Sequence, residues 1–148
     1  MPAKAGCAAL DPYTATMQWS RRCIGLKLFL SLAHHGASGQ AGMIEHQSDM
    51  GRLLRVLLEE SGWRIVNSSP LPLICFTRDG LDVPSFLAAL KERQIAWMSE
   101  VKIRGEAAVR ACVTSYRTTE EDIRWVVGQI NQLAGECAAS AVARQACQ

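Results

Sequence analysis

The sequence predicts an α+β domain in which helices cover one face of a small, mainly antiparallel sheet. Two observations carry this prediction. Segments with helical spacing and short β-like segments follow one another in the order helix, helix, strand pair, helix, strand, helix. The 148-residue chain is also 49% hydrophobic and 20% charged, which is typical of a globular protein and unlike a disordered one. A helix that is apolar on every side is expected to precede the sheet.

The composition pattern divides the chain into three parts. We expect residues 1–20 to be irregular, residues 21–135 to form the folded domain, and residues 136–148 to be an alanine-rich tail. This tail either extends the last helix or frays. No internal repeat or low-complexity block is visible, so the chain is interpreted as one domain.

The first predicted helix, residues 21–35, has no polar face and ends at Gly36, a residue type that commonly terminates helices. A helix that is apolar all round must be buried on all sides, and a domain of this size has difficulty enclosing one. We therefore expect it to pack against something outside this chain. The alternative is the central helix of a small bundle. Its apolar side chains are Ile24, Leu26, Leu28, Phe29, Leu30, Leu32 and Ala33.

The second predicted helix, residues 38–60, is followed by two predicted strands. Ser38 is the expected N-cap of this helix, and apolar residues recur along it at helical spacing. Residues 63–67 then alternate as a strand does, and residues 71–77 form the second strand. The second strand begins among prolines, which cannot donate to a ladder, so its beginning is expected at an edge.

The next predicted elements are a helix and further strands. Asp82 is the expected N-cap of a helix through Arg93, with Pro84 in its first turn. Residues 95–104 are ambiguous but contain at least one short strand. Residues 107–115, "AAVRACVTS", have apolar residues at both parities, and this pattern predicts a strand that is buried on both faces.

The last predicted helix opens on "RTTEED". Either Thr118 with Glu121 or Thr119 with Asp122 can form a capping box, and the acidic residues lie at the positive end of the helix dipole. The apolar stripe of this helix contains Ile123, Val126, Val127, Ile130, Leu133 and Ala134.

Charge and cysteine usage exclude several classes of protein. The formal net charge is only +2 and the charges are scattered, so no nucleic-acid-binding surface is expected. The six cysteines form no C-x-x-C pair and are interpreted as reduced thiols, which favours a cytoplasmic location. The N-terminus does not resemble a signal peptide, and the most apolar run is too short to cross a bilayer, so no membrane partner is expected.

Familiar catalytic and metal-binding patterns are not found either. The three histidines form no i, i+4 pair of the kind that holds zinc on a helix, so no metal ligand is predicted. No G-x-S-x-G motif and no recognisable Cys/His arrangement is present, so we predict no catalytic residue. The glycines of residues 36–42 are not preceded by a strand and are better explained as helix caps than as a phosphate loop.

Arg110 is the one candidate site residue, because it lies in the middle of the apolar stretch 107–115. Arginine is almost never fully buried without a partner, and removing the partner of a buried charge costs about 3–5 kcal/mol. Arg110 therefore reaches an edge, pairs with a carboxylate of this chain, or binds an anionic ligand.

Three segments, in this order and spacing, resemble one family. They are "QWSRRCIGLKLFLSLAHHGASG" (residues 18–39), "WRIVNSSPLPLICFTRDG" (residues 63–80) and "VRACVTSYRTTEEDIRWVVGQINQLA" (residues 109–134). Together they resemble the C-terminal part of the group II pyridoxal-phosphate-dependent amino-acid decarboxylases, which include aromatic-amino-acid, histidine and glutamate decarboxylases. The resemblance covers residues 13–135 but only the end of a complete family member. Leu28-Phe29 and Gln40 depart from the family pattern.

The resemblance implies a fold, a site and a set of partners. The fold is that of the C-terminal small domain of fold-type I pyridoxal-phosphate enzymes, and Arg110 takes the position that binds a substrate carboxylate. The complete enzyme uses pyridoxal 5′-phosphate, but the His-Lys pair that anchors it is not found here, so we expect no cofactor and no decarboxylation from this chain alone. The implied partners are a large cofactor-binding domain or a second subunit in a homo-oligomer, and an amino-acid substrate.

Two alternatives remain open. The chain is either such a fragment or a non-catalytic oligomerisation module that keeps the fold and uses its apolar first helix for association. A third and weaker hypothesis is a sensor domain in which Arg110 binds an anionic effector. If the fragment hypothesis holds, Arg110 should lack a full complement of acidic partners within this chain.

Overall fold

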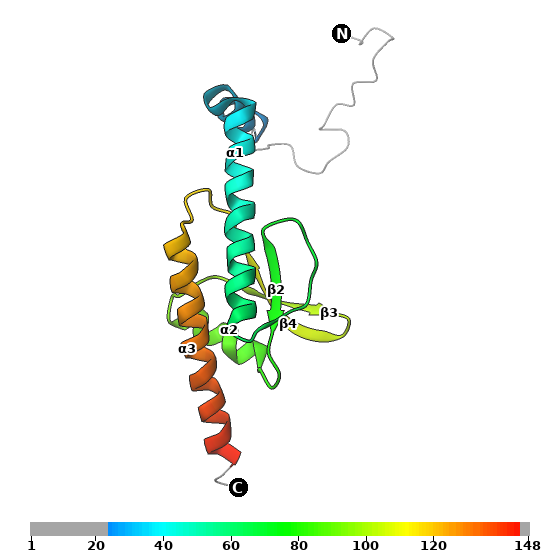
Figure 1. Ribbon diagram of the computed structural model, residues 1–148, viewed down its shortest axis with the longest axis vertical. Coiled ribbons are helices and arrows are strands. Elements are labelled where there is room, and N and C mark those ends of the chain that lie inside the picture. The colour runs from blue at the N-terminus through cyan, green and yellow to red at the C-terminus, as the bar shows by residue number, and fades with distance from the viewer. Residues whose placement is uncertain (1–23, 146–148) are drawn as a thin grey trace, which may run out of the picture. The chain divides into compact units, whose positions relative to one another are not determined.

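The computed structural model describes the chain over residues 24–145, and its side chains over residues 24–137 (Figure 1). The predicted irregular segment, residues 1–20, lies outside the described residues. The chain divides into two units, residues 1–40 and residues 41–148. The first unit contributes the beginning of a long helical run, and the second contains the sheet and the hydrophobic core.

The first helical run, α1 (Ile24–Glu60), is broken at Gly36, where φ is 67° and ψ is 176°. Only glycine adopts such a conformation without strain, because any other side chain would clash with the backbone. The run therefore consists of two helices, and the predicted end of the first helix at Gly36 is confirmed. Gln40 Nε2 donates a hydrogen bond of 2.5 Å to Ser31 Oγ across this break.

The helix before Gly36 has its large apolar side chains exposed. Their exposed fractions range from 42% at Leu32 to 71% at Ile24. The alternative, in which this helix is the buried centre of a small bundle, stays a prediction. The exposed side chains are Ile24, Leu26, Leu28, Phe29, Leu30 and Leu32.

The sheet has four strands in the order β1-β2-β4-β3, and every neighbouring pair is antiparallel. The strands are β1 (Arg64–Ile65), β2 (Leu73–Thr77), β3 (Ser99–Ile103) and β4 (Glu106–Cys112). This confirms the predicted small antiparallel sheet and places the expected strand of residues 95–104 at β3. A two-residue turn with positive φ joins β3 to β4, at Arg104 (53°) and Gly105 (85°).

Strand β1 is shorter than the predicted strand of residues 63–67. Beyond it, the Val66 N–H donates to the Cys75 carbonyl at 2.8 Å, and the side chain of Asn67 then takes over: its Oδ1 accepts the Cys75 N–H at 2.7 Å and its Nδ2 donates to the Leu73 carbonyl at 2.9 Å. Trp63, the first residue of the predicted strand, is a core residue instead, with 3% of its surface exposed.

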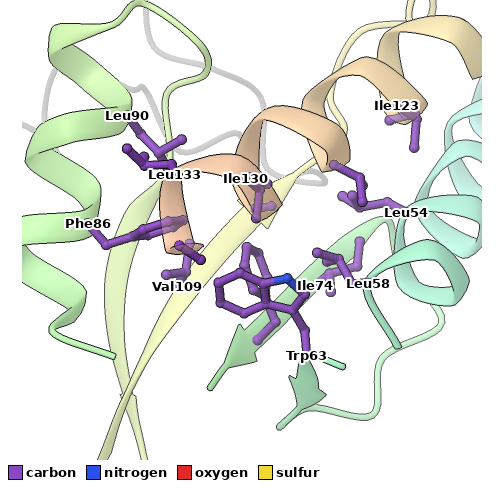
Figure 2. Packing of buried hydrophobic residues seen from close by; sticks show 14 of the residues in the cluster. Leu54, Leu58, Trp63, Ile74, Phe86, Leu90, Val109, Ile123, Ile130 and Leu133 are labelled. Carbon is purple, nitrogen blue, oxygen red and sulfur yellow. The ribbon is translucent and has the colours of Figure 1, made fainter. Parts of the chain in front are cut away.

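The hydrophobic core lies between the sheet and three helical segments, and Figure 2 shows its packing. These segments are residues 41–60 of α1, together with α2 (Val83–Glu92) and α3 (Glu120–Gln145). Figure 1 shows them on one side of the strands, as the sequence predicts. The largest fully buried side chains are Phe76, Phe86, Leu58, Ile74, Leu90, Ile130, Leu133 and Val109.

The helix ends follow the predictions in part. Asp82 occupies the N-cap of α2, but its side chain makes no capping hydrogen bond. At α3 the capping box pairs Thr119 with Asp122: the Asp122 carboxylate accepts from the Thr119 N–H and hydroxyl, and the Asp122 N–H donates to the Thr119 hydroxyl. These bonds hold the pKa of Asp122 below its usual range.

Helix α3 runs on to Gln145, so the alanine-rich tail extends the helix through that residue.

Candidate functional site on the open sheet face

Strand β4 presents two different faces. Val109 and Ala111 are buried against the helices, whereas Arg110 and Cys112 are exposed. The prediction that this strand is buried on both faces is therefore wrong. Of the residues that share the Arg110 face, Ala108 is buried, so the prediction holds at that position and fails at Arg110 and Cys112. We call the side of the sheet that carries Arg110 the open face.

Arg110 lies in the middle of a cross-strand row on the open face. The sheet register places it opposite Cys75 of β2 on one side and opposite Ser99 of β3 on the other. Its Nε donates a hydrogen bond of 3.0 Å to Ser99 Oγ. The side chain of Arg110 is exposed, so the strand carries no buried charge at this position.

No acidic side chain pairs with Arg110 among residues 24–137. The ion pairs in that part of the chain belong to other arginines: Arg52 with Asp49, Arg64 with Asp79 and Glu106, Arg93 with Glu136, and Arg124 with Glu120. These residues therefore do not supply the carboxylate of this chain with which Arg110 was expected to pair as one of the three explanations. The guanidinium charge is left available to a ligand.

The nearest neighbours of Arg110 are uncharged. Burial raises the pKa of the Cys75 thiol and outweighs the opposing effect of the Arg110 charge, so this thiol stays protonated at neutral pH. The Ser99 hydroxyl is neutral. Consequently the positive charge of Arg110 is neither neutralised nor repelled by the side chains directly opposite it.

The one acidic residue of β4, Glu106, is already paired with Arg64. Both guanidinium Nη atoms of Arg64 donate to the Glu106 carboxylate, which lowers the pKa of this carboxyl below its usual range. Leu73 and Val101 on this face are half-buried, whereas Cys75 is buried. The open face therefore combines the available charge of Arg110 with partly exposed apolar side chains.

Other candidate chemistry does not gather around Arg110. The rings of His34 and His35 contact each other edge to face, and His46 Nε2 bonds the Thr118 carbonyl at 2.8 Å. No group of three or more possible metal ligands occurs among the described residues. No helix of the described segment is long and apolar enough to cross a membrane.

One groove is bordered by the loop after β2, by α2 and by the second half of α3, and it has a volume of about 720 Å³. Arg93 and Glu136, which form an ion pair at 2.5 Å, are part of its lining, and no lysine or histidine is. This groove offers neither a nucleophile–base pair nor a group that could anchor an aldehyde cofactor.

Comparison with known proteins relates this fold to amino-acid decarboxylases. Tryptophan decarboxylase of Catharanthus roseus, solved with L-tryptophan, is 23% identical with a TM-score of 0.65 over 75% of this chain and 26% of its own. Oryza sativa TDC, solved with PLP and tryptamine, is 19% identical with a TM-score of 0.72 over 82% and 28%. The glutamate decarboxylase domain of a Vibrio parahaemolyticus transaminase and L-2,4-diaminobutyrate decarboxylase is 19% identical with a TM-score of 0.65 over 75% and 26%.

The coverage is strongly asymmetric. This chain spans only about a quarter of the length of these three solved proteins, although most of it superposes on them. No family model and no curated protein matches the sequence. The chain therefore has the α+β fold of one part of these pyridoxal-phosphate-dependent decarboxylases.

Proposed function

We propose that this chain is the C-terminal, small-domain part of a pyridoxal-phosphate-dependent amino-acid decarboxylase, in which Arg110 binds the carboxylate of the substrate. The observation that carries the proposal is an exposed arginine on the open face of the sheet, for which residues 24–137 supply no acidic partner. The partial match to decarboxylases, about a quarter of their length, supports it.

The chemistry of Arg110 suits this role. A guanidinium group is planar and always charged, and its paired N–H groups match the two oxygens of a carboxylate. Hydrogen bonds to charged groups contribute about 1.5–3 kcal/mol each. On an open sheet face, water and salt weaken such a bond, so a covering domain that excludes water would strengthen it. Arg110 therefore holds and orients substrate, and performs no bond-breaking step itself.

The described residues do not form a site for pyridoxal phosphate. In a complete enzyme the cofactor supplies the electron sink for loss of CO2, and a lysine carries it. The described lysines, Lys27, Lys91 and Lys102, are all exposed, and none lines the groove beside α3. In the proposed enzyme another domain would hold the cofactor, and we expect no decarboxylation from this chain by itself.

Two surfaces of this chain are available to that domain or to a second subunit. One is the helix of residues 24–35, whose apolar side chains are exposed. The other is the open face of the sheet, where Leu73 and Val101 are only half-buried. Large contiguous apolar surfaces on a soluble domain mark interaction sites. Covering the open face would also enclose Arg110.

The carboxylate-binding role is tested by titrating the chain with sodium acetate while the arginine side-chain signals are followed by NMR. We expect saturable shifts of the Arg110 signals at constant ionic strength. Backbone amide signals of β3 and β4 are followed in the same titration, and by this readout Arg110→Ala should weaken acetate binding at least about tenfold, because a charge-assisted hydrogen bond is lost.

The control for this titration is Arg117→Ala. Arg117 is also exposed and faces the ring of Tyr116, but it lies outside the sheet. This variant should bind acetate as the wild type does. Equal weakening by both substitutions would mean that acetate responds only to net charge, and the proposed role of Arg110 would then be wrong.

The exposed apolar helix also favours a second function, a non-catalytic oligomerisation module. Native mass spectrometry separates the two functions. The fragment should aggregate without a defined stoichiometry, and Leu28→Glu with Phe29→Glu should make it monomeric, because these side chains are 59% and 65% exposed. A single defined oligomer that these substitutions dissociate would favour the module over the fragment.

A further inference from the structure

We infer that Ser99 is a positioning residue, which orients the guanidinium group of Arg110 so that only its Nη1–Nη2 edge is offered to a carboxylate. The inference rests on the proposed function, since it assumes that Arg110 binds a carboxylate, but the orientation itself can be measured without a ligand.

The first support is the direct contact between the two side chains. Ser99 and Arg110 are register partners on neighbouring antiparallel strands, so their side chains project from the same face of the sheet. Arg110 Nε donates to Ser99 Oγ at 3.0 Å, a normal hydrogen-bond length. Ser99 is half-buried in strand β3, and pairing with β4 holds its backbone beside that of Arg110.

The second support is the shape of the guanidinium group. Its five N–H bonds form two edges on which a carboxylate can be bound by two parallel hydrogen bonds. One edge combines Nε with an Nη atom, and the other combines the two Nη atoms. Because Ser99 occupies Nε–H, the first edge is no longer available. The second edge stays free, and the bond at Nε restricts rotation of the whole plane.

The third support is the set of side chains around Arg110. Cys75 lies opposite it on the other neighbouring strand and is a protonated, buried thiol. Glu106, the acidic residue of the same strand, is bound to Arg64. No acidic group of the described residues therefore occupies the free edge. The free edge is therefore available to an external carboxylate.

The inference predicts a specificity consequence. A side chain that rotates freely binds carboxylates on either edge, whereas one held at Nε accepts them in one orientation only. In a complete decarboxylase this would fix the direction from which the substrate carboxylate enters, and it would lower the entropy cost of binding. Ser99 would contribute without touching the substrate.

The test compares Ser99→Ala, which removes the hydroxyl, with Ser99→Thr, which keeps it. Hydrogen exchange of the Arg110 Nε–H is measured by NMR, and acetate affinity is measured on the same samples. In Ser99→Ala we expect exchange about two- to tenfold faster and an acetate Kd about two- to tenfold higher, the range expected for one hydrogen bond. Ser99→Thr should restore both values.

Val101→Ala is the matched control, because Val101 is on the same strand and the same face, one row further along. It should leave both measurements unchanged, and the thermal stability of every variant shows that the fold is intact. Unchanged exchange of the Arg110 Nε–H in Ser99→Ala would overturn the inference. Failure of wild-type acetate binding would instead overturn the proposed function, and the exchange data would still decide the role of Ser99.

Discussion

Replacing Phe86 with alanine is expected to lower the free energy of unfolding by about 3–5 kcal/mol. The Phe86 side chain is fully buried, and its ring lies 5.7 Å from the ring of Trp63, measured between centroids. Removing it leaves a cavity between α2 and the sheet that the surrounding core cannot fill. The expected loss is measured by urea unfolding, followed through the fluorescence of the buried Trp63.

The matched control is the same substitution at Phe29, whose side chain is 65% exposed. Phe29→Ala removes the same atoms but should change the free energy of unfolding by no more than about 0.5 kcal/mol in dilute solution. An equal loss at both positions would show that the helix of residues 24–35 is packed against the domain, contrary to its exposure. A loss below about 1 kcal/mol at Phe86 would contradict the core arrangement in Figure 2.

Gly51→Ala should destabilise the domain even though alanine is the better helix former. Gly51 is buried in α1, and a Cβ placed on it would lie 2.7 Å from the Cα of Pro72 and 2.9 Å from its Cβ. Since Pro72 belongs to a rigid backbone segment, the clash is relieved only by moving the helix away from the sheet. Overpacking of this kind costs about 1–3 kcal/mol, against a gain of about 1 kcal/mol from helix propensity.

Gly128→Ala separates these two effects. Gly128 lies within α3, and a Cβ placed there meets no atom within 4 Å. This substitution should therefore raise the free energy of unfolding by up to about 1 kcal/mol, while Gly51→Ala lowers it. Thermal unfolding of the two variants side by side gives the comparison. Stabilisation by both substitutions would mean that α1 does not approach Pro72 as closely as the structure shows.

The features that depend on local backbone chemistry were predictable from the sequence. Gly36 ends the first helix because the backbone there adopts a positive φ. The capping box at α3 uses Thr119 and Asp122, one of the two pairings that the spacing allows. Both features are decided within a few residues, so no distant part of the chain can alter them.

The structure differs from the sequence-based expectation where side-chain hydrogen bonds differ from those expected. The predicted strand of residues 63–67 shrinks to β1 because the side chain of Asn67, and not its backbone, bonds to Cys75 and Leu73. No periodicity in the sequence reveals such a replacement. Likewise the capping bond expected from Asp82 is not made, although the residue occupies the predicted position.

The candidate site was predictable in part. Arg110 is conspicuous in the sequence because a charge interrupts an apolar strand. Ser99 has no such signal by itself, since its role depends on the register between β3 and β4. The two-residue turn at Arg104 and Gly105 sets this register by pairing Ile103 with Glu106, and counting outward from that turn would have placed Ser99 opposite Arg110.

The sequence by itself determined that this protein is an α+β domain with an apolar helix before Gly36. It also showed that one arginine interrupts a strand that is otherwise largely apolar. Only the tertiary structure decided how that charge is accommodated. A strand with apolar residues at both parities does not show which of its faces the helices will cover, and alanines fit either face equally well. Packing of the helices on the Val109 side left Arg110 on the open face, without an acidic partner among the described residues and bonded to Ser99.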